Sequence, residues 1–249
     1  GEYVHQDVVW QAYFNAGLIL LGLGGDALDR NNPYLNNPNQ GAFTSFGGPF
    51  LLHLLTYAGN LSLQGAWYHK WLVHRRLRPE TYGGRVHHQM ESGKSYEIHP
   101  ELLNSAGAAL AATNTGGYFL SQAYPEGSPT HPAYPAGHAT IAGSCCTVLK
   151  AFFNEDYVLP SPVVSDSTGS ALNAWRGDDL TVGNEINKLA ANISLGRDAA
   201  GVHYRSDGID GIDGNDNNNE LVSQLESEFC NTYSPTIIPS SNPSVVPSN

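Results

Sequence analysis

The sequence has little positive charge and little cysteine. Its 249 residues include 12 lysines and arginines against 23 aspartates and glutamates, which gives a formal net charge of −11. Such an acidic chain is poorly suited to binding nucleic acid or an anionic membrane surface, because both repel it. The three cysteines, Cys145, Cys146 and Cys230, are too few for a disulfide framework. A Cys145–Cys146 bridge is not expected, because neighbouring cysteines on a helix point in different directions.

Long hydrophobic runs are also missing. The most apolar block, residues 16–23, is much shorter than the roughly 18 to 20 residues that a membrane-spanning helix needs. We therefore expect no membrane partner. Hydrophobic residues still make up 41% of the chain, and over this length they suffice for one large domain with a buried core.

Apolar residues recur at helical spacing, and no stretch alternates as a β-strand would. The fold class is therefore predicted to be all-α. We expect helices over residues 7–23, 51–58, 61–76, 102–124 (interrupted near 116–117), 138–153, 182–200 and 221–229. Pro79 should end the third of these helices, because a proline forces the residue before it out of helical geometry. We expect a helical domain over residues 1–230 and a proline- and serine-rich tail over 231–249 that cannot form a core.

The stretch "THPAYPAGHATIAG" (residues 130–143) places His138 directly after a glycine, where a helix is expected to begin. The start of a helix has unpaired N–H groups and the positive end of the helix dipole, so it favours anions. The sequence therefore predicts an anion site beside His138.

Positive charge is concentrated although it is scarce. Five of the 12 cations lie within 16 residues: Lys70, Arg75, Arg76, Arg78 and Arg85. A solvated helix face explains such a cluster as well as a binding site does. In "LGRDAAGVHYRSDG" (residues 195–208), Arg197 precedes His203 by six positions, so the two would lie about 120° apart on a straight helix. They can converge only if the helix breaks near Gly201.

Three segments, "KWLVHRRLRPE", "SPTHPAYPAGHA" and "GRDAAGVHYRSDG", together resemble the vanadate-site segments of vanadium-dependent haloperoxidases, in particular the algal bromoperoxidases. Acid phosphatases share the same anion pocket. The resemblance covers roughly residues 7–211 and implies a helical bundle of the haloperoxidase and acid phosphatase type. Family chains are considerably longer, so this chain resembles their C-terminal part. The resemblance also implies a homo-oligomer and an extracellular or cell-wall location.

The resemblance assigns a role in binding vanadate to six positions. His203 is the imidazole that bonds vanadium. The other five contact the vanadate oxygens or line the pocket: Trp67, Lys70, Arg78, Gly137 and Arg197. Arginine suits such an oxyanion because it donates several hydrogen bonds in one plane.

The resemblance also assigns catalytic roles to four positions. His138 is the acid–base histidine, and Asp7 is the carboxylate that supports it. Lys70 polarises the bound peroxide, and His131 matches a histidine typical of bromoperoxidases, although it could instead cap the loop before Pro132. The family usually has serine before the glycine at position 137, and Ala136 removes that hydroxyl donor, which brings the affinity for the cofactor into question.

Other charged residues have simpler interpretations. Arg75 and Arg76 match no role in the family and are expected to form surface or interhelical ion pairs. Arg205 and Asp207 are expected to pair with each other. Residues 210–220, "DGIDGNDNNNE", resemble a calcium loop but lack glycine at the sixth position, so a solvated turn is favoured over a calcium site.

The resemblance thus implies a vanadium-dependent bromoperoxidase. Such an enzyme uses hydrogen peroxide to oxidise bromide and iodide to hypohalous acid, which halogenates small organic acceptors. One alternative is an acid phosphatase in which His203 forms a phosphohistidine. A second alternative is a non-catalytic anion-binding or assembly fragment, which would follow if the pocket is incomplete.

Overall fold

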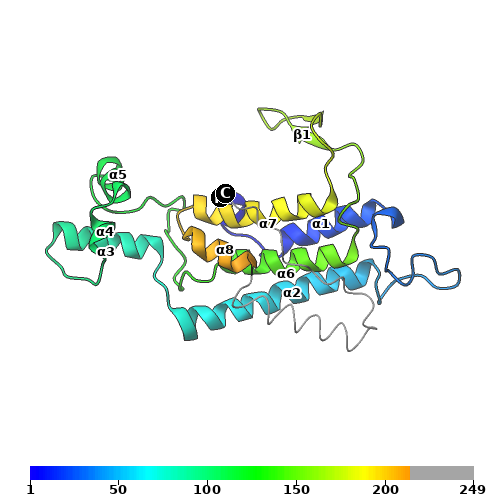
Figure 1. Ribbon diagram of the computed structural model, residues 1–249, viewed down its shortest axis with the longest axis horizontal. Helices are drawn as coiled ribbons and strands as arrows, with labels where there is room; N and C mark the ends of the chain where they lie inside the picture. Colours follow the sequence, from blue (N-terminus) through cyan, green and yellow to red (C-terminus); the bar gives the residue numbers. More distant parts are fainter. Residues whose placement is uncertain (214–249) are drawn as a thin grey trace.

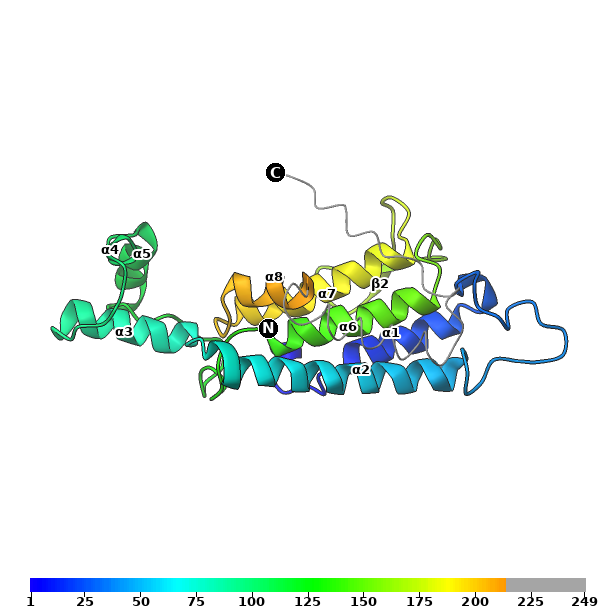
Figure 2. The same cartoon turned by 60° about the horizontal axis from the view of Figure 1, so that its bottom comes forward.

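A bundle of long helices forms most of the protein, and a smaller helical arm projects from one end (Figures 1 and 2). The computed structural model describes residues 1–213. The bundle consists of α1 (Gln11–Gly22), α2 (Gly48–Tyr68), α6 (Gly137–Phe152), α7 (Val182–Ala199) and α8 (Arg205–Asp213). The predictions of an all-α class and a helical bundle are confirmed.

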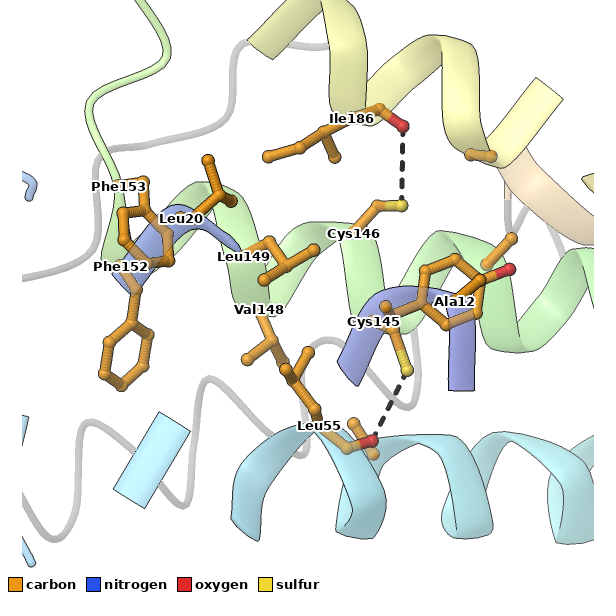
Figure 3. Close-up of a cluster of buried hydrophobic side chains, with 14 of the residues drawn as sticks. Ala12, Leu20, Leu55, Cys145, Cys146, Val148, Leu149, Phe152, Phe153 and Ile186 are labelled. Atoms are coloured by element: carbon orange, nitrogen blue, oxygen red, sulfur yellow. Dashed lines mark hydrogen bonds between the residues drawn. The ribbon is translucent and has the colours of Figure 1, made fainter. Parts of the chain in front are cut away.

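Helix α6 is the central element, because it packs against α2, α7 and α8. Ten of its 16 residues are buried, including Ile141 and Leu149, and full burial of such side chains contributes about 1.5 to 3 kcal/mol each. Cys145 and Cys146 are free thiols that point to opposite sides of α6 (Figure 3). Their Sγ atoms donate to the carbonyl oxygens of Leu55 on α2 and Ile186 on α7, so the expectation that they form no bridge is confirmed.

The prediction that one helix ends at residue 58 and another begins at residue 61 is wrong. Helix α2 runs without interruption through Gly59, where the lack of a side chain leaves room for a neighbouring helix. A Cβ atom at this position would lie 3.0 Å from Cβ of Trp10, so glycine allows close packing against the start of α1. After Tyr68 the chain widens into the π-helical segment η3 (His69–His74).

The arm is formed by α3 (Pro79–Glu91), α4 (Pro100–Leu103) and α5 (Ala106–Thr115). Arg78 has an extended backbone before Pro79, as predicted, but Pro79 also begins α3, which the sequence analysis missed. The predicted helix over 102–124 is too long. Helix α5 ends at Gly116, whose φ of 69° gives a left-handed cap, and the chain then runs as irregular structure to α6.

The remaining elements are short. They are the 3₁₀ segments η1 (Glu2–Val4) and η2 (Gly25–Ala27), and an antiparallel hairpin of β1 (Val163–Ser165) and β2 (Leu172–Ala174) that was not predicted. In the described part of the chain, no helix is long and apolar enough to cross a membrane. The predicted helix at 221–229, the tail at 231–249 and most of the calcium-like stretch lie outside the described residues.

Candidate oxyanion-binding site

A pocket of about 270 Å³ opens at the end of the bundle where α6 begins. Eight of the nine predicted site residues line it: Asp7, Trp67, Lys70, His131, Gly137, His138, Arg197 and His203. The ninth, Arg78, contacts two of them. The structure therefore brings together residues from four segments that lie far apart in the sequence.

His203 is held in one orientation by partners on both ring nitrogens. Helix α7 ends before Gly201, whose φ of 78° turns the chain and carries His203 back toward Arg197. Its Nδ1 lies 3.0 Å from Oδ2 of Asp207, and its Nε2 lies 3.0 Å from Nη1 of Arg78. Because a guanidinium can only donate, Nε2 must accept, and the proton of the neutral ring lies on Nδ1. Nε2 therefore carries a lone pair that a metal centre could use.

Burial and nearby positive charge keep His203 neutral. Its side chain is 2% exposed, and burial lowers the pKa of the imidazole well below its ordinary value. The cations Arg78, Lys70 and Arg197 lower this pKa further. A neutral imidazole is the form that binds a metal.

The prediction that Asp207 pairs with Arg205 is wrong. Oδ1 of Asp207 accepts from Nη1 of Arg76 at 2.7 Å, whereas no pair with Arg205 forms. Asp207 lies in the first turn of α8, and its Oδ2 reaches back to accept from the backbone N–H of Tyr204 as a capping carboxylate does. This local geometry directs the carboxylate toward His203. The expectation that Arg76 forms an ion pair is confirmed.

Lys70 lies within the π-helical turn and is fully buried. Its Nζ donates to the carbonyl oxygens of Pro132 (2.7 Å) and Ala133 (3.0 Å), which leaves one N–H for another acceptor. Burial lowers the pKa of Lys70 to about 6, and the nearby Arg78 adds to this effect. A negative charge in the pocket would restore the ammonium form.

Arg78 connects the other two segments of the site. Its Nε donates to the carbonyl oxygen of His131 and its Nη1 to that of Val202, both at 2.8 Å. Burial lowers the pKa of Arg78 to about 10, so it stays charged at neutral pH. Its Nη2 lies 3.1 Å from Nδ1 of His131, and burial together with the adjacent Lys70 lowers the pKa of His131 to about 4. His131 is therefore a neutral wall of the pocket, 5.7 Å between ring centroids from Trp67.

Arg197, in the last turn of α7, has a donor without a partner. Its Nη1 donates to the carbonyl oxygen of Val4 at 2.7 Å, but its Nε is buried and has no hydrogen-bond partner among residues 1–213. An unsatisfied buried donor of this kind costs about 1 to 3 kcal/mol. An anion in the pocket would remove that cost.

His138 lies at the second position of α6 and faces Asp7. Its Nε2 lies 2.8 Å from Oδ1 of Asp7, and the two side chains are 15% and 6% exposed. Asp7 is free to reach it because α1 begins only at Gln11, four residues later than the predicted start. Gly137 begins α6, so its backbone N–H has no partner within the helix, and the residue lines the pocket. Ala136 is the N-cap and makes no side-chain hydrogen bond.

These groups suit an oxyanion better than a metal cation. No cluster of three or more histidine, cysteine, aspartate or glutamate side chains able to hold a cation occurs in residues 1–213. The pocket instead offers three buried cationic side chains, a helix N-terminus, an unsatisfied guanidinium N–H and one imidazole lone pair. An oxyanion that brings its own oxygens and needs a single nitrogen ligand fits this donor set.

Sequence reasoning missed Asp207 as a site residue, although His203 and Asp207 are four positions apart. This i,i+4 spacing is the signal that could have identified the pair. It also missed His5, which lines the pocket and contacts Glu126. No sequence signal connects His5 with Glu126, because 121 positions separate them.

Comparison with known proteins gives one family match. Residues 52–230 match the family described as "VCPO second helical-bundle domain". The chain is similar to the vanadium-dependent bromoperoxidase of Ascophyllum nodosum, with 42% identity over 79% of this chain, and to that of Corallina officinalis, with 37% identity over 82%. Among solved structures, it resembles the homohexameric second vanadate-dependent bromoperoxidase of A. nodosum, with 29% identity and a TM-score of 0.75 over 98% of this chain.

The chain spans only part of these proteins. It covers 37% and 38% of the two curated relatives and 44% of the solved chain. The match therefore concerns the region that contains the pocket.

Proposed function

The chain belongs to the VCPO second helical-bundle domain family, and on that premise we propose that it is the vanadate-binding catalytic part of a vanadium-dependent bromoperoxidase. The observation that carries the proposal is the state of His203: its proton is fixed on Nδ1 by Asp207, and its Nε2 lone pair contacts the buried Arg78 in a pocket that Lys70 and Arg197 also line.

The same residues would hold vanadate. Nε2 of His203 would be the nitrogen ligand to vanadium, and Arg78 would donate to an oxygen of the anion in place of Nε2. Nε of Arg197, the third N–H of Lys70 and the backbone N–H of Gly137 would donate to the other oxygens. Ala136 supplies no hydroxyl, so these donors must neutralise the anion without it.

Vanadate bound in this way would supply Lewis-acid activation of hydrogen peroxide without changing its own oxidation state. The overall reaction is H₂O₂ + Br⁻ + H⁺ → HOBr + H₂O, in which bromide loses two electrons and the peroxide gains them. His138 takes up and returns protons at its ring, and Asp7 stabilises the imidazolium. Trp67 and His131 form an uncharged wall of the pocket.

We further propose that the enzyme accepts iodide as well as bromide, that hypohalous acid leaves to halogenate small organic acceptors, and that the protein assembles as a homo-oligomer. The homohexameric state of the similar A. nodosum structure supports the last point. An extracellular or cell-wall location stays a prediction.

The proposal is tested by measuring peroxide-dependent bromide oxidation in the full-length protein after removal and return of vanadate. Activity should be absent without vanadate and restored by it in stoichiometric amount. The control variant is His99→Gln, because His99 lies in the arm and is exposed. Hydrolysis of a phosphate monoester by the vanadate-free protein, without bromide oxidation after vanadate is added, would instead identify a phosphatase. Vanadate binding with neither activity would identify a non-catalytic anion-binding module.

A further inference from the structure

A third imidazole–carboxylate pair lies at the pocket, formed by His5 and Glu126. His5 follows η1 and is one of the pocket-lining residues. Its Nε2 lies 2.5 Å from Oε1 of Glu126. The side chain of His5 is 17% exposed and that of Glu126 is 57% exposed, so the carboxylate lies in solvent while the imidazole faces the pocket.

Both members of the pair are held in place. Residues 124–127 form a tight turn, closed by a hydrogen bond from the N–H of Gly127 to the carbonyl oxygen of Tyr124, and Pro125 suits its second position. The ring of His5 stacks on that of Tyr124 with centroids 3.8 Å apart and an interplanar angle of 2°. The pair is therefore a positioned feature and not a chance contact of two long side chains.

Tyr124 also contacts a residue of the proposed vanadate site. Cζ of Arg197 lies 5.6 Å from the ring centroid of Tyr124, and Nη1 of Arg197 donates to the Tyr124 hydroxyl at 3.3 Å. Within residues 1–213, the hydrogen bond of the His5 ring is the one between Nε2 and Glu126. The ring that lines the pocket is thus bonded through one nitrogen to a solvent-exposed carboxylate, and its Nδ1 has no such partner among the described residues.

The proposed reaction consumes one proton for each bromide oxidised, and that proton must come from solvent. At pH 8 the proton concentration is about 10⁻⁸ M, so even a diffusion-limited rate constant of about 10¹⁰ M⁻¹s⁻¹ would deliver only about 100 protons per second. Enzymes typically turn over at about 1 to 1,000 per second. Direct supply of free H⁺ therefore becomes limiting on the alkaline side. A titratable group that takes protons from buffer acids, which are far more concentrated than free H⁺, would relieve this limit. The His138–Asp7 pair is less able to take up protons from solvent than the His5–Glu126 pair, because Asp7 is 6% exposed and Glu126 is 57% exposed.

We infer that His5 and Glu126 form a proton relay that carries protons from solvent into the pocket during bromide oxidation. The inference rests on the proposed function. When the neutral ring holds its proton on Nδ1, Nε2 accepts the proton that Glu126 collects at the surface. The ring then releases the Nδ1 proton into the pocket, which leaves Nε2–H donating to the ionised carboxylate of Glu126. Exchange of the ring proton from Nε2 back to Nδ1 through solvent restores the starting form. No electron moves in these steps.

The charge around His5 comes from several elements. Glu126 pairs with it, and the hydrogen bond from His5 holds the pKa of that carboxyl below its ordinary value. The other titratable or charged groups in its surroundings are Tyr124 and, behind it, Arg197, and across the pocket Asp7, Lys70, His131, His138 and His203. Glu126 is thus the only carboxylate in contact with His5 among the described residues.

The test compares His5→Gln and Glu126→Gln with the parent, in the full-length protein with saturating vanadate, peroxide and bromide. Rates are measured from below to above the ordinary histidine pKa of about 6.5. His5→Gln should match the parent on the acid side and fall about 10-fold on the alkaline side. This loss of rate is smaller than the roughly 100- to 10,000-fold loss expected on removing a group that acts in the chemical step. Imidazole added to the buffer should restore the alkaline rate of His5→Gln and leave the parent unchanged.

The matched control is His99→Gln. His99 and Glu101 form another histidine–glutamate pair, 3.8 Å apart and exposed, away from the pocket. This variant should reproduce the pH profile of the parent. Two further readouts do not depend on turnover: vanadate titration should give His5→Gln the affinity of the parent, and carboxyl NMR of the vanadate-free protein should show the pKa of Glu126 rising when His5 is replaced.

The outcomes separate the relay from a purely structural role. A rate in His5→Gln that is unchanged at every pH, or that falls by the same factor at every pH, overturns the relay. Loss of vanadate binding in His5→Gln also overturns it, because the pair would then only support Arg197. If the vanadate-loaded parent does not oxidise bromide, the proposed function itself fails. If the parent is active but the effect of His5→Gln on the rate does not depend on pH, only the relay is overturned.

Discussion

Two of the three imidazole–carboxylate pairs at the pocket, His203–Asp207 and His138–Asp7, differ in burial and in neighbours. In His203–Asp207 both side chains are almost completely buried, and the second ring nitrogen contacts Arg78. In His138–Asp7 the imidazole is 15% exposed and lies at the N-terminus of α6. The imidazole of His203 is therefore fixed in one tautomer, whereas the imidazole of His138 is accessible from the pocket.

This difference separates two tasks that one residue type can perform. A buried imidazole surrounded by cations stays neutral over a wide pH range and serves as a fixed ligand. An imidazole with a carboxylate partner and access to the pocket can gain and lose a proton in each turnover. Changes to either pair should therefore affect different quantities.

The largest effect is expected from His203→Ala. Removal of the single nitrogen ligand should abolish vanadate binding and, with it, bromide oxidation. The measurement is the amount of vanadium retained after gel filtration of the loaded protein, with circular dichroism as a check on the fold. Stoichiometric vanadium in this variant would contradict the assignment of His203 as the ligand.

His138→Ala should reduce turnover by about 100- to 10,000-fold, the usual contribution of a general acid–base group. Vanadate affinity should remain that of the parent, because the proposed task of His138 is proton transfer. Steady-state rates at saturating peroxide and vanadate titration test the two statements separately. Equal rates in variant and parent would exclude His138 from the chemical step.

Asp207→Asn should weaken vanadate binding by about 10- to 100-fold, the usual effect of removing a carboxylate that orients a histidine ligand. The matched variant is Asp7→Asn, which removes the same charge from the other pair and should lower turnover while leaving vanadate affinity unchanged. Vanadate titration of both variants provides the comparison. The same loss of affinity in both would show that the two pairs do not differ as we propose.

The smallest effect is expected in the pH dependence of vanadate affinity, to which Lys70 contributes. Its pKa of about 6 makes the amine mostly neutral at neutral pH in the vanadate-free pocket, and the bound anion should raise this pKa. Binding then takes up a proton, so affinity should fall as the pH rises above about 6, by at most about 10-fold per unit. Calorimetry in buffers of different ionisation enthalpy measures the uptake. Lys70→Met corrects for protons that vanadate itself exchanges, and equal uptake in parent and variant would exclude Lys70 as the source.

The sequence was most informative where the signal is local. Helices α6 and α7 follow from continuous helical spacing, and the break at Gly201 follows from the need to bring Arg197 and His203 together. The nine predicted site residues lie in or next to the pocket for the same reason, because each belongs to a segment with a recognisable pattern.

Tertiary contacts explain what the sequence did not reveal. Gly59 looks like a helix breaker, but close packing against Trp10 requires a glycine there. Asp207 has a cation two positions away in sequence, yet its partner is Arg76, 131 residues distant, because the first turn of α8 lies beside the loop that follows η3. Helix α3 has few apolar residues at helical spacing and buries little, so its pattern gave no helical signal.

The central claim is that Nε2 of His203 is the nitrogen that binds vanadium while Asp207 holds Nδ1. A crystal structure of the protein soaked with vanadate tests this most directly. We expect vanadium bonded to Nε2 of His203, with the Nδ1–Asp207 hydrogen bond retained and Arg78 donating to an oxygen of the anion. Vanadium on another side chain, or His203 turned so that Nδ1 binds the metal, would contradict the account.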